Sequence, residues 1–353
     1  MDTLIEVTTD PVSRYLTQRG AKFDRKNRLR IMDTSEVLDT ALRIYQRFGL
    51  TFLRLTVAPA LLCLASVGFV QTYVLPGLFL TKNGGAPTQV IADVAIALAT
   101  AVFVGGPLFL LGMSYSSSIV VQIVSDYMVG KTPDPEAAAE AARAVLPRLF
   151  LVNLKELCLS VSGIVVSTAV MAFGGYLTSV TANTDAAAGA VAFVGVLGLC
   201  AGGIIFLYIV ACDSLAAPIA VLEGVGPREA SRRSRELLKK FGYHPAGTGT
   251  IWSVYCLLGF MAAVLSTGIV VCAEILSLSE RLASLLAFLP AEQVFLRAFN
   301  LLPSFFVIWT LMPVWASVIT IVYYERKIRL EGFDIDVLAS DIARGNRALS
   351  TEL

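Results

Sequence analysis

The sequence predicts an all-α membrane protein in which six transmembrane helices are combined with short amphipathic helices on the cytoplasmic side. The first observation is composition: 56% of the 353 residues are hydrophobic and 16% are charged, against roughly 45–50% and about 25% in soluble domains. The second is that apolar runs long enough to cross a bilayer recur along the chain, whose mean hydropathy is +0.72. The third is that lysine and arginine concentrate in alternate connecting segments, as they do on the cytoplasmic side of membrane proteins.

The chain divides into an N-terminal arm at 1–33, a six-span membrane domain at 34–339 and a tail at 340–353. The arm is polar and of mixed charge. It has no apolar segment beside a basic start, so we expect no cleavable signal peptide and an arm exposed to the cytoplasm. Its basic residues can be attracted to anionic lipid or can dock onto a partner.

Six apolar runs are the expected spans, and each odd-numbered span is preceded by a short amphipathic helix. Thr34 or Ser35 is a suitable N-cap for the first of these helices. The second apolar run, as one helix of about 40 residues, would be about 60 Å long, twice the hydrocarbon thickness. We expect it to tilt, to project beyond the bilayer or to kink, and Gly105-Gly106-Pro107 is the expected kink site. The expected spans are 50–80, 90–129, 150–180, 188–222, 247–276 and 294–324, and the expected amphipathic helices are 36–48, 135–149 and 227–241.

The helix expected at 227–241 is strongly basic. Pro227 suits its first turn because proline has no N–H to leave unpaired. Glu229 lies near the positive helix start, and Gly242 is a suitable C-terminal stop. We therefore expect an amphipathic helix at the membrane surface. Its apolar face consists of Ala230, Ser234, Leu237, Leu238 and Phe241.

The distribution of lysine and arginine predicts the orientation in the membrane. The three loops expected on the outer side carry only Lys82 and Arg281. By the positive-inside rule, both termini are therefore expected in the cytoplasm. The basic blocks on that side are nine residues in 1–49, three in 130–149, six in 223–246 and five from 325 onward.

The order of elements also suggests an internal repeat of three helical hairpins. Each unit would consist of an amphipathic helix, a span, an outer loop and a returning span. Pro135-Glu136-Ala137 is similar to Pro227-Arg228-Glu229-Ala230 at the start of two of these units. A true repeat implies hairpins stacked around a shared axis or cavity. The alternative is that any six-span chain alternates between the two sides of a membrane.

Two motifs resemble one known family. One is Pro218-Ile219-Ala220-Val221-Leu222-Glu223-Gly224, and the other is the stretch YYERKIRLEGFD at 323–334. Together they resemble the bacterial and archaeal membrane proteins named after the membrane domain of glycerophosphoryl diester phosphodiesterase, and the general plan is similar from Ser35 to Ala339. The resemblance implies a polytopic protein of a prokaryotic cytoplasmic (inner) membrane. It carries over no activity, because no segment here could form the catalytic barrel domain.

A candidate intramembrane polar site consists of Asp213, Arg54 and Lys155. Asp213 lies in the fourth apolar run, where an ionised side chain is costly unless it faces a partner or a cavity. It could be a proton or ion relay, or it could form a structural ion pair with Arg54 or Lys155. Gly195, Gly198, Gly202 and Gly203 lie in the same run and could allow close helix packing or line a ligand crevice.

A second set of residues is expected to contact anionic lipid headgroups. In the C-terminal motif we expect Tyr323 and Tyr324 at headgroup level and Gly332 to turn the chain, so that Phe333 packs back on the helices. The expected headgroup contacts are Arg228, Arg232, Arg233, Lys239, Lys240, Arg326, Lys327 and Arg329.

The sequence contains no pattern typical of an enzyme, so we expect none. His244 is the single histidine, and no GxxxxGK[ST], GxGxxG or HExxH motif occurs. We expect no metal, no cofactor and no nucleic-acid partner. The six cysteines lie in apolar runs without a CxxC pair and are expected to be buried small hydrophobes, although metal or disulfide chemistry stays open.

The function these patterns favour is a non-catalytic scaffold or subunit of a membrane complex, with lipid and either a protein partner or a second copy as its contacts. The alternative is a transporter or channel for a lipid or small solute, because prolines interrupt several spans and Asp213 is intramembrane. An intramembrane enzyme acting on lipid is the third hypothesis.

Overall fold

The computed structural model describes residues 32–70, 100–180, 185–239, 246–276, 299–333 and 335, and in this part of the chain the regular structure is helical. Six of its helices are long and apolar enough to cross a membrane. The chain is therefore a polytopic membrane protein, as the composition predicts. The elements in order are α2 (Thr34–Phe69), the π-helix η3 (Ala101–Gly105), α5 (Gly106–Val129), α6 (Pro135–Val180), α7 (Asp185–Asp213), α8 (Ala216–Leu222), α9 (Pro227–Lys239), α10 (Ala246–Ile275) and α13 (Leu302–Glu331).

Helix α2 begins earlier than the sequence predicts and runs further without a break. Its N-cap is Asp33, not Thr34 or Ser35, and the N–H of Asp33 donates to the Glu36 carboxylate at 3.4 Å. This arrangement resembles a capping box, in which the residue at N3 satisfies the cap N–H. The amphipathic helix expected at 36–48 and the first span form one helix through Pro59.

The helix type changes at the site where the second span is expected to kink. The π-helical turn of η3 ends at Gly105, and α5 begins at Gly106 with Pro107 in its first turn, where proline is tolerated. The backbone oxygen of Gly105 accepts a hydrogen bond from Ser66 of α2 at 2.6 Å. Helices α2 and α5 also approach closely: a Cβ added at Gly112 of α5 would lie 2.5 Å from the carbonyl oxygen of Pro59 in α2.

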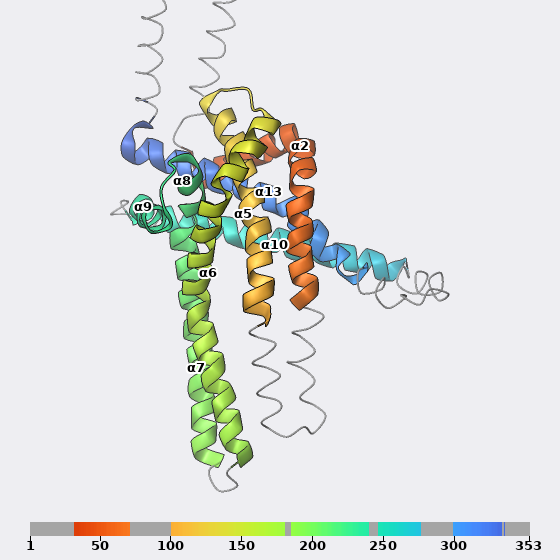
Figure 1. The fold of residues 1–353 in the computed structure, drawn as a ribbon, viewed down its shortest axis with the longest axis vertical. Coiled ribbons are helices and arrows are strands. Elements are labelled where there is room, and N and C mark those ends of the chain that lie inside the picture. Colours follow the sequence, from red (N-terminus) through yellow and green to blue (C-terminus); the bar gives the residue numbers. More distant parts are fainter. Residues whose placement is uncertain are drawn as a thin grey trace, which may run out of the picture.

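Helices α6 and α7 form the second hairpin and lie side by side (Figure 1). The amphipathic helix expected at 135–149 is continuous with the third span, so α6 is a single helix of 46 residues. A Cβ added at Gly163 would lie 3.3 Å from the Cα of Gly202, and one added at Gly198 would lie 2.8 Å from the Ser167 hydroxyl. The close helix packing considered for the glycines of α7 is therefore present at Gly198 and Gly202, but not at Gly203, where an added Cβ would meet no atom within 4 Å beyond the local helix backbone.

The fourth expected span is broken. Helix α7 ends at Asp213, and α8 starts at Ala216 after a short turn. Gly224 then adopts a φ of +70°, which glycine reaches without the steric penalty of other residues. The chain turns there into α9, and Asp213 lies at the end of α7.

Helices α10 and α13 form the third pair in contact. Helix α10 matches the span expected at 247–276 closely, whereas α13 extends seven residues beyond the expected end at Tyr324, to Glu331. Gly332 has a φ of +64° and ends α13 as expected. Figure 1 shows α10 and α13 running across the direction of α6 and α7.

The core lies where these helices meet. It contains the N-terminal parts of α2, α6 and α10, the C-terminal parts of α5 and α13, and helices α8 and α9. In contrast, α7 and α10 carry many exposed large apolar side chains along most of their length. A helix that is apolar on all sides needs an apolar environment, so these helices suit contact with lipid or another membrane protein.

Candidate functional site

Helix α9 is amphipathic as predicted and packs into the core. Ala230, Ser234, Leu237 and Leu238 are buried, and the Ser234 hydroxyl donates to the backbone oxygen of Cys212 at 2.8 Å. Phe241, expected on the same face, lies outside the described residues, as do Lys240 and Gly242. Lys239 is the last residue of the helix. The apolar face of α9 therefore covers the break between α7 and α8.

Asp213 pairs with Arg235 of α9. Its side chain is 1% exposed, and its two oxygen atoms accept hydrogen bonds from Arg235 Nε at 2.8 Å and Nη2 at 3.1 Å. Such a bidentate pair is short and directional. Hydrogen bonding to Asp213 raises the pKa of Arg235. The structure thus supports the structural role considered for Asp213, with a different partner from the two that the sequence suggested.

The other members of the predicted intramembrane site are placed elsewhere. Lys155, on α6, donates to the Ser231 hydroxyl at 2.9 Å and is 3.5 Å from the Pro227 carbonyl oxygen. Arg54 is exposed on α2. Neither forms an ion pair with Asp213, so the three residues do not make one site.

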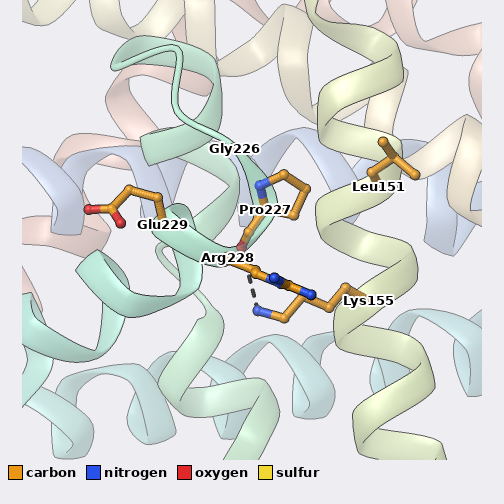
Figure 2. Close-up of a pocket in the computed structure, with 6 residues that line it drawn as sticks. All are labelled: Leu151, Lys155, Gly226, Pro227, Arg228 and Glu229. Carbon is orange, nitrogen blue, oxygen red and sulfur yellow. Dashed lines mark hydrogen bonds between the residues drawn. The ribbon is translucent and has the colours of Figure 1, made fainter.

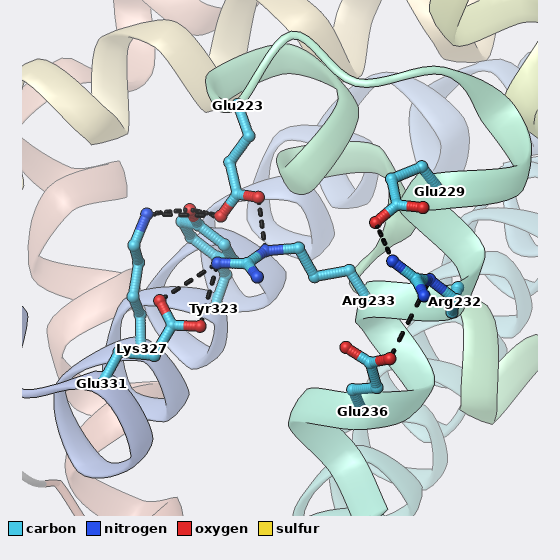
Figure 3. A network of polar contacts seen from close by, with 8 residues as sticks. All are labelled: Glu223, Glu229, Arg232, Arg233, Glu236, Tyr323, Lys327 and Glu331. Carbon is cyan, nitrogen blue, oxygen red and sulfur yellow. Dashed lines mark hydrogen bonds and ion pairs between the residues drawn. The ribbon is translucent and has the colours of Figure 1, made fainter.

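A second network joins α8, α9 and α13 around Glu223 (Figure 3). Glu223 Oε1 accepts hydrogen bonds from the Tyr323 hydroxyl at 2.8 Å and from Lys327 Nζ at 3.2 Å. Its other oxygen lies 2.5 Å from Arg233 Nε. Arg233 also donates to both carboxylate oxygens of Glu331, at 2.9 and 3.1 Å. We call these five residues together with Asp213 and Arg235 the helix junction.

The network keeps Glu223 ionised. Partial burial by itself raises the pKa of this carboxyl, but the hydrogen bond from Tyr323 and the charges of Lys327 and Arg233 outweigh it, so the pKa is lowered from its ordinary value of 4.5. A carboxylate with several donors and two cations nearby is stabilised in its charged form. The network therefore joins two basic side chains, Arg233 and Lys327, to two acidic ones, Glu223 and Glu331.

Most of the cations expected to bind lipid headgroups are already paired within the chain. Arg326 is buried, and its Nε lies 3.0 Å from Glu325. Arg329 donates to the same carboxylate at 2.6 Å, and Arg232 donates to Glu229 at 2.6 Å. Arg326 therefore does not face headgroups in this structure. For the exposed cations, headgroup binding stays a prediction.

The two tyrosines of the C-terminal motif lie inside the protein and not at its surface. Tyr323 and Tyr324 are buried, and Tyr324 shares a hydrogen bond with Ser125 of α5 at 2.8 Å. Phe333 packs back as expected, with its ring 5.8 Å from that of Tyr324. The motif thus acts as an internal contact between α13 and its neighbours, and the depth of these tyrosines at headgroup level stays a prediction.

A pocket opens between α6 and the start of α9, with a cavity volume of about 540 Å³ (Figure 2). Arg228 is exposed at its edge and forms no ion pair within the described part of the chain. Among the residues that the structure describes, no group of three histidine, cysteine, aspartate or glutamate side chains could hold a metal ion. The lining residues are Leu151, Lys155, Gly226, Pro227, Arg228 and Glu229.

The cysteines are only partly where the sequence places them. All six are free thiols, so no disulfide forms. Cys63 and Cys212 are buried as expected, but Cys158, Cys200, Cys256 and Cys272 lie on the exposed apolar surface of their helices. In a membrane protein that surface is still an apolar environment, which suits an uncharged thiol.

The sequence did not identify Arg235, Glu223 or Glu331 as members of a site. The available signal was the pattern of charges within the two family-like motifs, since Glu223 ends one and Tyr323, Lys327 and Glu331 belong to the other. These motifs meet in the helix junction. Comparison of the chain with protein-family models, with curated proteins and with solved structures finds no match.

Proposed function

We propose that this chain is a non-catalytic scaffold or complex subunit of a prokaryotic cytoplasmic membrane, with both termini on the cytoplasmic side. The observation that carries the proposal is the helix junction. Its charged side chains neutralise one another between α7, α8, α9 and α13. Groups committed to ion pairs within the chain hold helix ends together, which is what a scaffold for membrane hairpins requires.

Two further features support this proposal. Within the described residues the helices that precede the odd spans adjoin the core, as expected if three hairpins repeat around one junction. The two motifs that resemble the glycerophosphoryl diester phosphodiesterase membrane-domain family contact each other there through Glu223, Tyr323 and Lys327. If the chain is related to that family, both motifs have the same structural role, which is to form the helix junction.

The surface available to a partner is the apolar face of α7 and α10. A Cβ added at Gly203, Gly259 or Gly268 would meet no atom within 4 Å in the described structure beyond the local helix backbone. Small residues exposed on membrane helices allow another helix to approach closely. We propose that another membrane protein or a second copy of the chain packs there.

Photocrosslinking in the native membrane tests the scaffold proposal. A photoreactive residue would replace Phe193 on α7 or Phe260 on α10, with Leu61 on α2 as an exposed apolar control. We expect crosslinks to one defined polypeptide from the first two positions and not from the control. A chain that forms no protein crosslink from either position, and has the mass of one copy in mild detergent, would contradict the proposal.

A transporter is the second candidate, favoured by the helix break at Asp213 and by a second acidic group nearby. Glu156 of α6 lies within electrostatic range of Asp213, and helices broken at depth often form transport sites. The test is movement of a fluorescent phospholipid between the leaflets of reconstituted vesicles. Transport that Asp213→Asn abolishes would favour this candidate, and transport equal to that of protein-free vesicles would remove it.

A further inference from the structure

We propose that the pocket between α6 and α9 binds the headgroup phosphate of an anionic phospholipid between Lys155 and Arg228. The pocket is open and holds about 540 Å³, within the usual range for small-molecule sites. Figure 2 shows Lys155 reaching toward the start of α9, where Arg228 extends along the same side of the pocket. The two cations thus come from different helices and border one space.

The first argument is that neither cation has a carboxylate partner in the described structure. Lys155 is half-buried, and its ammonium donates to the Ser231 hydroxyl and lies near the Pro227 carbonyl oxygen, which are both neutral. Arg228 is exposed and forms no ion pair among the described residues. A partly buried ammonium is costly without a counter-charge, so the pocket is suited to an anion.

The acidic residues near the pocket do not cancel this charge. Glu229 lines the pocket, but its carboxylate accepts from Arg232 at 2.6 Å. Glu156 lies within electrostatic range of Lys155 without forming an ion pair with it. Asp213 is paired with Arg235. The pocket lining therefore keeps a positive balance at the end of α9 where the helix dipole is also positive.

The second argument identifies the ligand as a lipid and not as a free anion. Leu151 and Leu159 lie four residues before and after Lys155, and residues four apart share one face of a helix. Both leucines are exposed, at 52% and 44%. The face of α6 that presents Lys155 is therefore apolar on both sides, which suits the acyl chains of a lipid whose phosphate reaches the ammonium. A lysine near the end of a membrane span can direct its charge to the headgroup level.

Lipid binding to the purified full chain tests this site. Native mass spectrometry of the delipidated protein would measure the affinity for the first molecule of phosphatidylglycerol and of phosphatidylcholine. We expect one phosphatidylglycerol to bind more tightly than phosphatidylcholine. Lys155→Gln and Arg228→Gln should each weaken phosphatidylglycerol binding about tenfold, since charge-assisted hydrogen bonds are among the strong ones. Arg143→Gln, which removes an exposed cation of α6 that does not line the pocket, should change it less than about twofold.

Two further variants separate ligand binding from folding. Ser231→Ala removes the internal partner of Lys155 and leaves its charge, so the affinity should stay within about twofold of the unchanged protein. Lys155→Arg keeps the charge and should restore most of the affinity that Lys155→Gln loses. The thermal unfolding midpoint of each variant without lipid shows that it is folded.

The proposal is overturned if Lys155→Gln and Arg228→Gln bind phosphatidylglycerol as the unchanged chain does, or if Arg143→Gln weakens binding equally. It is also overturned if phosphatidylcholine binds as tightly as phosphatidylglycerol. Millimolar inorganic phosphate should not displace the lipid. Displacement by phosphate would instead assign the pocket to a free anion.

Discussion

Asp213 is the most deeply buried charged group of the helix junction, and Arg235 binds both of its oxygen atoms. The arginine is 42% exposed, so the pair lies at the border between the protein interior and the surface. Removing the exposed partner of such a pair leaves the buried charge without a counter-charge. The free-energy cost of that unpaired charge exceeds the net contribution of the intact pair to stability.

Replacing Arg235 with glutamine should lower the free energy of unfolding by about 1–3 kcal/mol, less than for a fully buried pair because water screens the arginine. The double variant Asp213→Asn/Arg235→Gln should recover part of the loss, since no unpaired carboxylate remains. Thermal or detergent unfolding measures both. Arg232→Gln is the matched control, because Arg232 pairs with Glu229 and Glu236 on the exposed side of α9, and it should change stability much less than Arg235→Gln does. Equal effects of Arg235→Gln and Arg232→Gln would show that the pair with Asp213 is not a stabilising contact.

Glu223 should make the stability of the junction depend on pH. Because its pKa is lowered in the folded chain from the ordinary 4.5, the folded state binds fewer protons than the unfolded state in this range. The contribution of Glu223 to the free energy of unfolding is therefore complete above about pH 4.5. This contribution is lost as the pH falls through the lower pKa that Glu223 has in the folded chain. The difference in unfolding midpoint between the unchanged chain and Glu223→Gln should shrink as the pH falls from 7 to 3. A difference that is constant with pH, or no greater than that for Glu229→Gln, would contradict this account.

At the residue scale, the sequence could indicate Asp213 as unusual but could not identify its partner. An acidic residue in an apolar run is visible in the sequence. Its pairing with Arg235 depends on the chain breaking at Ser214-Leu215 and turning at Gly224. The turn at Ser214-Leu215 contains neither proline nor glycine, so the apolar run looks continuous through Leu222.

Helices α6 and α7 are held together by small residues at the element scale. Gly163 and Ser167 face Gly198 and Gly202, so that a side chain at Gly198 would collide with the Ser167 hydroxyl. In membranes, where apolar surfaces gain little from contact with each other compared with lipid, such close approach contributes through van der Waals packing.

Gly198→Val should separate α6 from α7 and lower stability by about 1–3 kcal/mol, the usual cost of forcing extra volume into a packed contact. Gly203→Val introduces the same residue five positions further along α7, on a different face, where an added Cβ meets no atom within 4 Å beyond the local helix backbone. It should change stability by less than about 0.5 kcal/mol. Unfolding of both variants in the same detergent provides the comparison. If Gly203→Val is as destabilising as Gly198→Val, helix propensity rather than the α6–α7 contact explains the effect.

The change of helix type before Pro107, the bounds of α10 and the stop at Gly332 lie at positions that the sequence marks through its local chemistry. The continuity of α2 and α6 did not follow, because an amphipathic segment joined to an apolar one has the same pattern whether or not the helix bends between them. Pro59 and Pro147 lie inside these helices without ending them, which shows how packing can override a local helix breaker.

On the scale of the whole molecule, three helical pairs share one core. The third pair, α10 and α13, runs across the direction of the second pair, α6 and α7 (Figure 1). A flat bilayer accepts helices tilted by up to about 40° from its normal. Helix α10 has 30 residues and is therefore about 45 Å long, which exceeds the hydrocarbon thickness. Because it is apolar over most of its surface, we expect it to reorient in a bilayer and cross it alongside α6 and α7.

The depth of spin labels in nanodiscs checks this expectation. Labels replacing Phe193 of α7 and Ile275 of α10, both exposed, should lie in the outer half of the bilayer, as shown by their accessibility to oxygen and to a water-soluble relaxation agent. A label at Ile275 found at the inner interface would show that α10 lies along the membrane surface and that the chain does not cross the bilayer six times.

The proposed function depends most on the side of the membrane on which α9 and the helix junction lie. In a variant without native cysteines, a cysteine replacing Glu236, a half-exposed residue of α9, would be treated with a membrane-impermeant thiol reagent in intact cells. A cysteine replacing Asn183, in the second loop expected on the outer side, serves as the opposite control. We expect Asn183→Cys to react in intact cells and Glu236→Cys to react only after the cells are opened. Reaction of Glu236→Cys in intact cells would contradict the orientation on which the proposed function depends.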